Sequence, residues 1–285
     1  MDYAHPEYLI STDALEEVLE DPGLRIFDTT VFIKPDGIQS GLENYLQAHL
    51  PRAGFLDLVK VLSDRDSPLG FTLPSDERLE LGFRAAGIEP DGLVVLYSTN
   101  QMMWATRLWW MLYYAGHKNI KILDGGYAKW IAEGRPVNND PTPYPASDFK
   151  VQPDPDVWAD KDDVLAAIED DRVCTVCALS PEVYSGKSET NYGRPGHIKG
   201  SRNLFYATVL DNECFRPAAD IKRAFEDKGA FDKERMITYC GGAIAATVDA
   251  FALSLMGHEK VAVYDGSMSE WARDDSLPME TGADN

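Results

Sequence analysis

The sequence predicts an α/β protein made of two copies of one unit. Continuous apolar runs, such as residues 92–97 and 236–239, alternate with helical patterns, and such runs are typical of strands buried in a parallel sheet. In addition, glycine, aspartate and tryptophan residues recur at one offset, since 257 − 116, 265 − 124 and 271 − 130 all equal 141. A shared offset of this kind indicates an internal duplication.

Each expected element of the first half follows from a local pattern. A Ser/Thr cap and helical spacing predict a helix over residues 11–19, and a short apolar run predicts a strand over 24–28. A polar, glycine-containing loop then leads to residues 44–55. Beyond it we expect a helix over 73–87, a strand over 92–97, an apolar helix over 104–114 and a strand with its turn over 120–126.

The second half repeats this order. We expect an acidic helix over residues 162–168, a strand over 173–178, and a strand over 236–239 that leads into a helix. A proline- and aspartate-rich segment separates the two copies. We therefore predict a first domain over residues 1–140, a linker over 141–156 and a second domain over 157–285, with a site near their interface.

Composition excludes several classes of function. A net charge of −20 and a pI near 4.5 argue against partners such as nucleic acid or an anionic membrane surface. Four cysteines in 285 residues are too few for a disulfide scaffold. The N-terminus has no basic and apolar leader pattern, and the apolar run near residues 102–114 is too short to span a bilayer. We expect a cytoplasmic protein.

The stretch after the strand at 236–239 carries the clearest chemical pattern. Cys240 is followed by Gly241 and Gly242 and then by helical spacing. The glycines allow the backbone to curl with its N–H groups inward, beside the positive end of a helix dipole. This setting favours a thiolate, which is the nucleophilic form of cysteine. The alternative, a buried structural cysteine, does not account for the glycine pair.

The repeat also indicates which copy is catalytic. Residues 94–98 align with residues 236–240, which places Ser98 where the second copy has Cys240. A serine there has no thiolate and no evident activating base. We expect the first copy to be inactive.

An ordered set of segments resembles the tandem-domain rhodanese family, the thiosulfate and 3-mercaptopyruvate sulfurtransferases. The segments are residues 48–53 and 196–201, residues 123–126 with Trp130, residues 264–267 with Trp271, and the Cys240 loop. The resemblance extends nearly from end to end. It implies two rhodanese-like domains, each a five-stranded parallel sheet flanked by helices on both faces.

The resemblance also implies a persulfide on Cys240. A small-molecule sulfur donor would load the cysteine, and an acceptor such as cyanide or a thiol would then remove the sulfur, with no metal or organic cofactor. We expect the sulfur anion to be stabilised by the amides of the loop, contributed by Gly241, Gly242, Ala243, Ile244, Ala245 and Ala246.

Donor choice depends on charge near the loop. Thiosulfate-type members usually carry basic residues after the cysteine, whereas this loop is neutral and is closer to the mercaptopyruvate type. Two departures weaken this inference: Gly242 and Ala245 replace hydroxyl residues, and Val183 stands where many members have an arginine. Arg194 is the nearest replacement anion binder, the alternative being a solvated loop arginine.

Other residues have both a functional and a structural interpretation. His49 could orient or protonate a substrate, or its ring could bond the backbone of its own turn, as its repeat mate suggests. The spacing of Cys174 and Cys177 matches redox and zinc sites, but both lie within a strand pattern and are expected to be core residues.

Two further functions were considered. A cysteine phosphatase would need an arginine six residues after Cys240, where this chain has Ala246. A rhodanese-fold binding or regulatory module is the remaining alternative to an enzyme. The sequence does not indicate an oligomeric state.

Overall fold

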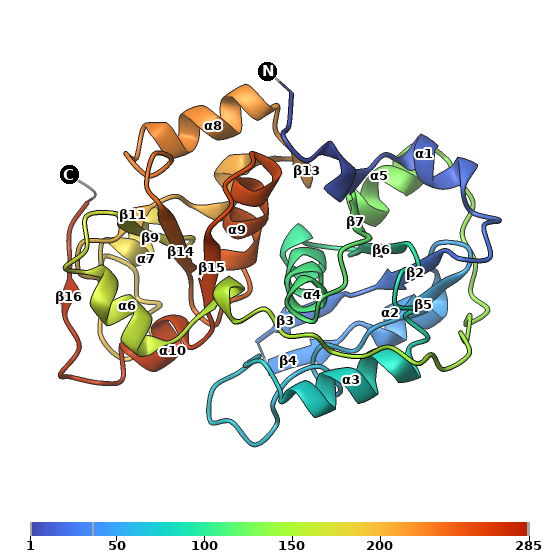
Figure 1. The fold of residues 1–285 in the computed structure, drawn as a ribbon, viewed down its shortest axis with the longest axis horizontal. Helices are drawn as coiled ribbons and strands as arrows, with labels where there is room; N and C mark the ends of the chain where they lie inside the picture. Colours follow the sequence, from blue (N-terminus) through green and yellow to red (C-terminus); the bar gives the residue numbers. More distant parts are fainter. Residues whose placement is uncertain (1, 36, 284–285) are drawn as a thin grey trace.

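The computed structural model describes residues 2–35 and 37–283, and it contains two five-stranded sheets, one in each half of the chain (Figure 1). The strand order is β1-β7-β6-β2-β5 in the first sheet and β8-β15-β14-β9-β11 in the second. All neighbouring strands of both sheets are parallel. Equivalent strands therefore take equivalent places, and the duplicated α/β fold is confirmed.

The strands are short and mostly buried. Those of the first sheet are β1 (Leu9–Ile10), β2 (Arg25–Asp28), β5 (Ala53–Phe55), β6 (Val94–Tyr97) and β7 (Ile120–Leu123). Those of the second sheet are β8 (Trp158–Ala159), β9 (Val173–Cys177), β11 (Arg202–Asn203), β14 (Arg235–Tyr239) and β15 (Val261–Tyr264). Three antiparallel pairs lie outside these sheets: β3 (Val31–Lys34) with β4 (Gly37–Ser40), β10 (His197–Ile198) with β16 (Met279–Glu280), and β12 (Leu210–Asp211) with β13 (Cys214–Phe215).

Helices cover both faces of each sheet, as the resemblance implied. On the first sheet, α1 (Thr12–Glu17), α2 (Leu42–Gln47) and α5 (Gly126–Ala132) share one face, and α3 (Asp76–Ala85) and α4 (Met102–Tyr114) share the other. On the second sheet, α6 (Lys161–Ala167), α7 (Pro181–Tyr184) and α10 (Ser267–Trp271) lie opposite α8 (Ala218–Glu226) and α9 (Ala246–Leu255). Short 3₁₀ turns are η1 (Pro6–Tyr8), η2 (Pro155–Val157) and η3 (Tyr206–Val209). No helix in the described residues is long and apolar enough to cross a membrane.

Local sequence explains where helices begin and end. The Ser11 side chain accepts a hydrogen bond from the N–H of Ala14 at the start of α1, and Ser75 caps α3 in the same way. Gly87 follows α3 with a φ of 74°, a conformation that favours glycine and stops the helix.

Regular structure also occurs where we expected only loops. These elements are the β3–β4 hairpin, the single turn α7 and the β12–β13 hairpin. Each strand or helix among them has only two to four residues, which is too short to give an apolar period, so the sequence pattern could not indicate them.

The two halves meet through α4 and α9, which lie between the sheets (Figure 1). Thr106 on α4 and Thr247 on α9 are hydrogen-bonded through their hydroxyls at 2.8 Å, and 247 − 106 is 141, the repeat offset. Equivalent residues of the two copies thus meet each other, which places a pseudo-twofold axis at this pair. Trp109 packs edge-on against Phe251 nearby, with ring centroids 5.0 Å apart. One apolar core runs through both halves.

Candidate active site

Cys240 lies directly after β14, the central strand of the second sheet. Its side chain is nearly buried, with 3% exposure. The loop that follows leads into α9, whose first residue is Ala246. The predicted strand–loop–helix arrangement around the cysteine is therefore present.

Helix α10 holds the first carbonyls of this loop. The carbonyl of Cys240 accepts from the N–H of Met268 at 3.0 Å, and the carbonyl of Gly241 accepts from the N–H of Ser269 at 2.9 Å. The Ser269 hydroxyl donates to the same Gly241 oxygen at 2.6 Å. With these carbonyls bound to α10, the backbone of the loop is fixed at its start.

Ala243 is the point where the loop reverses. Its φ is 56°, in the left-handed region that a residue with a Cβ occupies at a cost of about 1 kcal/mol. The Ser267 hydroxyl accepts from the N–H groups of Ala243 and Cys240, at 3.1 and 3.2 Å, and donates to the carbonyl of Tyr264 at 2.8 Å. This hydroxyl holds both ends of the turn in place.

Most of the loop amides that we expected to bind an anion have no acceptor. Ala243 is the exception, because its N–H is occupied by Ser267, so the expectation for this amide is wrong. Among the described residues, no acceptor is found for the backbone N–H groups of Gly241, Gly242, Ile244, Ala245 and Ala246. Five unpaired donors next to a helix N-terminus and a cysteine form an anion-binding loop.

The first domain also reaches this loop, through Arg107 on α4. The Arg107 side chain is fully buried and donates to the carbonyl of Ala243 at 3.3 Å, to that of Phe71, and to the Asp265 carboxylate at 3.0 Å. Asp265 accepts in turn from the N–H of Leu73 at 2.7 Å. Arg107 therefore connects the first domain to the catalytic loop through a hydrogen bond, and to Asp265 through a partly buried ion pair.

Two tyrosines lie near the thiol. A Cβ on Gly241 would lie 2.1 Å from the hydroxyl oxygen of Tyr192, so the phenol lies directly over this residue. Burial, and then the neighbouring Cys240, raise the pKa of Tyr192 to about 12. Burial, Glu213 and Cys240 raise the pKa of Tyr206. Both phenols stay protonated at neutral pH.

The other strand cysteines are core residues in the structure. Cys174 and Cys177 are buried on β9, and neither forms a disulfide. Burial raises the pKa of Cys177 to about 12, so this thiol is protonated at neutral pH and is not a nucleophile.

The His49 side chain is not accessible to a substrate. The ring is fully buried and stacks on Tyr45 at 4.1 Å. Its Nδ1 contacts the carbonyl of Tyr45 at 2.6 Å, and its Nε2 contacts the carbonyl of Asp140 at 3.2 Å. Both nitrogens are used within the first domain, so the expected substrate role is not supported and the structural alternative accounts for the residue.

Arg194 is likewise occupied by its own chain. Its guanidinium donates to four backbone carbonyls at 2.6–3.2 Å, contributed by Trp271, Ala272, Asp274 and Leu277. These bonds fix the segment that follows α10. They leave Arg194 without a free face for a substrate anion, contrary to the expectation from sequence.

The equivalent loop of the first domain is filled by the second domain. Ser98 stands at the place of the nucleophile and hydrogen-bonds Asn100 at 2.8 Å. The Glu213 carboxylate, from the β12–β13 hairpin, accepts from the N–H of Met102 at the start of α4. A protein carboxylate thus occupies the helix N-terminus that a substrate anion would need.

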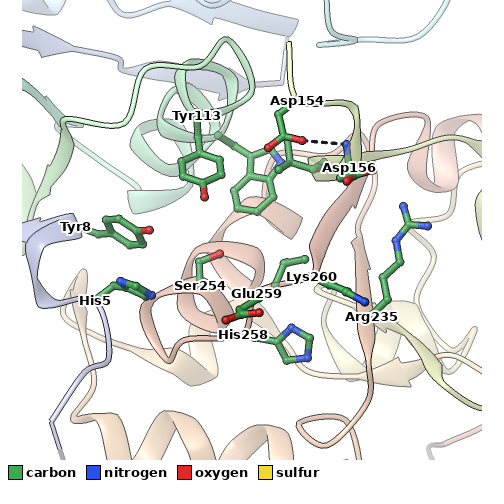
Figure 2. Close-up of a pocket in the computed structure, with 13 residues that line it drawn as sticks. His5, Tyr8, Tyr113, Asp154, Asp156, Arg235, Ser254, His258, Glu259 and Lys260 are labelled. Carbon is green, nitrogen blue, oxygen red and sulfur yellow. Dashed lines mark hydrogen bonds between the residues drawn. The ribbon is translucent and has the colours of Figure 1, made fainter. Parts of the chain in front are cut away.

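A cavity of about 620 Å³ lies between the two halves (Figure 2), and Cys240 is not among the residues that line it. It is lined from the N-terminal segment by His5 and Tyr8, from α4 by Tyr113, and by Arg235 and Lys260 near the beginnings of β14 and β15. Cys240 is at the opposite, carboxyl end of β14. Ligands of parallel α/β sheets bind at carboxyl ends, so this cavity is not the reaction site.

Comparison with known proteins agrees with this geometry. The model of the rhodanese-like domain matches residues 11–133 and again residues 157–274. The chain belongs to the rhodanese family. It is 30% identical to the sulfur carrier protein TtuD of Thermus thermophilus, over 99% of each chain, and 32% identical to a thiosulfate sulfurtransferase of Cricetulus griseus, over 96% of this chain and 94% of the relative.

Solved structures show the same relationship. The rhodanese-fold 3-mercaptopyruvate enzyme SseA of Escherichia coli superposes with a TM-score of 0.84 at 27% identity, covering 91% of this chain and 98% of the other. The resemblance inferred from the motifs is confirmed, and so is the sulfurtransferase class. The donor, the persulfide and the individual residue roles belong to the proposal below.

Sequence reasoning missed the serines that hold the loop. Adding the repeat offset of 141 to Gly126 and Ala128 gives Ser267 and Ser269, so only the catalytic copy has hydroxyls there. Gly126 and Ser267 both have positive φ, 53° and 46°. A comparison of the two copies position by position would have indicated these residues. Nothing in the local pattern indicates that Arg107 reaches across the interface.

Proposed function

We propose that this protein moves a sulfane sulfur from a small anionic donor to a thiophilic acceptor through a persulfide on Cys240. The observation that carries the proposal is the loop of five unpaired N–H donors beside a nearly buried cysteine at the N-terminus of α9. Such donors stabilise the negative charge that the sulfur carries before and after transfer.

The first half-reaction is a displacement at sulfur. The Cys240 thiolate attacks the outer sulfur of the donor, the new S–S bond forms, and the bond between that sulfur and the rest of the donor breaks. With thiosulfate the leaving group takes the electron pair as sulfite. With 3-mercaptopyruvate it leaves as the enolate of pyruvate, and the proton of the donor thiol ends on its methyl carbon.

The second half-reaction regenerates the thiolate. A nucleophilic acceptor, cyanide or a thiol, attacks the outer sulfur of the persulfide, and the electron pair of the S–S bond returns to Cys240. Because donor product leaves before acceptor reacts, the kinetics are ping-pong.

A donor with a single negative charge is favoured. The Arg107 guanidinium is already paired with Asp265, and Arg194 is bonded to backbone carbonyls. The loop therefore offers backbone dipoles rather than free cations. 3-Mercaptopyruvate, whose thiol is largely protonated at neutral pH, suits this site better than the thiosulfate dianion.

Steady-state turnover with each donor and cyanide tests the proposal. We expect activity with both donors, a higher kcat/KM for 3-mercaptopyruvate, and loss of activity in Cys240→Ser. Cys214→Ser, which removes a partly exposed thiol on the β12–β13 hairpin, is the matched control and should stay active. Full activity in Cys240→Ser would contradict the mechanism.

The binding-module alternative makes a different prediction. A module without turnover would bind its partner equally well with serine at position 240 and would gain no sulfur from either donor. The four free thiols suit a reducing compartment, and a cytoplasmic location therefore stays our expectation.

A further inference from the structure

Tyr192 lies over the residue that follows the nucleophile. It belongs to the segment between α7 and β10, and a Cβ on Gly241 would lie 2.1 Å from its hydroxyl oxygen, 2.4 Å from Cζ and 2.5 Å from Cε1. The glycine is therefore required by the phenol. The ring therefore lies next to the catalytic loop.

The Tyr192 hydroxyl has no hydrogen-bond partner among the residues that the structure describes. Its neighbours differ: the Tyr184 hydroxyl donates to the carbonyl of Ser201 at 2.5 Å, and the Tyr239 hydroxyl bonds the Ser201 side chain at 2.7 Å. Largely buried tyrosines usually find such a partner. Tyr192 itself is half-buried and its hydroxyl stays accessible, so this phenol beside the catalytic loop is available as a donor to a bound molecule.

The charges around the loop indicate what kind of molecule this donor would bind. Arg107 is neutralised by Asp265, Arg194 is bonded to its own backbone, and the position expected for a substrate arginine is Val183. The phenol of Tyr192 stays protonated at neutral pH, because burial raises its pKa to about 12, and its O–H can therefore donate to a bound anion. A single O–H donor suits the charged end of a small anion.

We propose that Tyr192 binds the anionic end of the sulfur donor, its O–H donating to a carboxylate or sulfonate oxygen while Cys240 attacks the sulfur. The inference rests on the proposed function, because it assigns the recognition of the donor to a residue of the same site. In this proposal the phenol of Tyr192 binds the substrate anion in place of the arginine that Val183 replaces. The substrate class is then a small organic or inorganic anion.

Alkylation of Cys240 tests this residue without any sulfur transfer. Iodoacetate is anionic and iodoacetamide is neutral, and both react with the thiolate. We expect Tyr192→Phe to lower the ratio of the iodoacetate rate to the iodoacetamide rate about tenfold, as loss of a hydrogen bond to a charged group implies. Tyr114→Phe, whose hydroxyl bonds Asp76 in the first domain, is the control and should keep the wild-type ratio.

Turnover gives the second readout. Tyr192→Phe should lower kcat/KM for 3-mercaptopyruvate by about the same factor, mainly through KM. Gly241→Ala places a methyl group on the phenol and displaces it, so the loss in Gly241→Ala/Tyr192→Phe should equal that in Gly241→Ala alone. If the double variant instead lost activity by the product of the two single-variant factors, the proposal would be overturned.

The failures are distinguishable. An unchanged alkylation ratio in Tyr192→Phe overturns the role of Tyr192, whatever the turnover. Absence of turnover in the wild-type protein contradicts the proposed function. A lowered alkylation ratio in Tyr192→Phe would even then support anion binding by Tyr192.

Discussion

Replacement of Arg107 by methionine should weaken both the fold and the catalytic loop. The change removes a fully buried guanidinium and leaves the Asp265 carboxylate, 22% exposed, without its cation. Breaking a buried ion pair costs about 3–5 kcal/mol, and the partial exposure of Asp265 places the expected loss near the lower value, about 3 kcal/mol. The Ala243 carbonyl also loses its donor from the first domain.

Two measurements follow from this contact. Chemical denaturation gives the free energy of unfolding, and iodoacetamide gives the reactivity of Cys240. We expect both to fall in Arg107→Met, because the left-handed turn at Ala243 is no longer held from the first domain. Arg172→Met, which breaks an exposed pair with Asp170, is the matched control and should change neither.

A double variant separates the ion pair from simple loss of packing. Adding Asp265→Asn to Arg107→Met removes the unpaired charge while keeping an acceptor for the N–H of Leu73. The double variant should therefore have a higher free energy of unfolding than Arg107→Met alone. A loss below about 1 kcal/mol in Arg107→Met, with Cys240 reactivity unchanged, would refute the reasoning.

Three further changes address other parts of the structure. Ser267→Ala leaves the N–H of Cys240 without an acceptor, so we expect about 2 kcal/mol less stability and slower single-turnover sulfur transfer; an equal transfer rate would contradict it. Burial raises the pKa of Asp28 to about 6, above its unfolded value, so this group stabilises the fold at acid pH and that stability is lost as pH rises through 6. The unfolding free energy of the wild type relative to Asp28→Asn should therefore fall by about 2 kcal/mol from pH 4 to pH 8 in denaturation experiments, and a constant difference would be inconsistent with the raised pKa. Glu213→Gln removes the charge at the N–H of Met102 and should cost about 1 kcal/mol in the same assay, whereas a more stable variant would argue against this domain contact.

The fold could be predicted because its signals are local and repeated. Buried strands such as β6 and β14 are continuous apolar runs, and the offset of 141 relates the closing segments of the two copies. The hairpins and α7 could not be predicted, because elements of so few residues are stabilised by contacts with the rest of the chain rather than by their own pattern. The strand–loop–helix setting of Cys240 was predicted for the same reason as the sheet.

The surroundings of the cysteine were harder to predict. The sequence left a substrate role open for His49, from its position in the family motif, and for Arg194, as the nearest replacement anion binder, but burial and backbone contacts occupy both side chains. Arg107, Tyr192 and Ser267 reach the loop from segments distant in sequence, and no spacing rule relates them to Cys240. Such contacts depend on how the two halves pack together.

The intact mass of the protein after incubation with donor alone tests the central claim most directly. We expect the wild-type protein to gain one sulfur atom on Cys240 and to lose it on addition of cyanide, while Cys240→Ser gains none. A wild-type mass that stays unchanged with both thiosulfate and 3-mercaptopyruvate, or an equal gain in Cys240→Ser, would contradict the persulfide account.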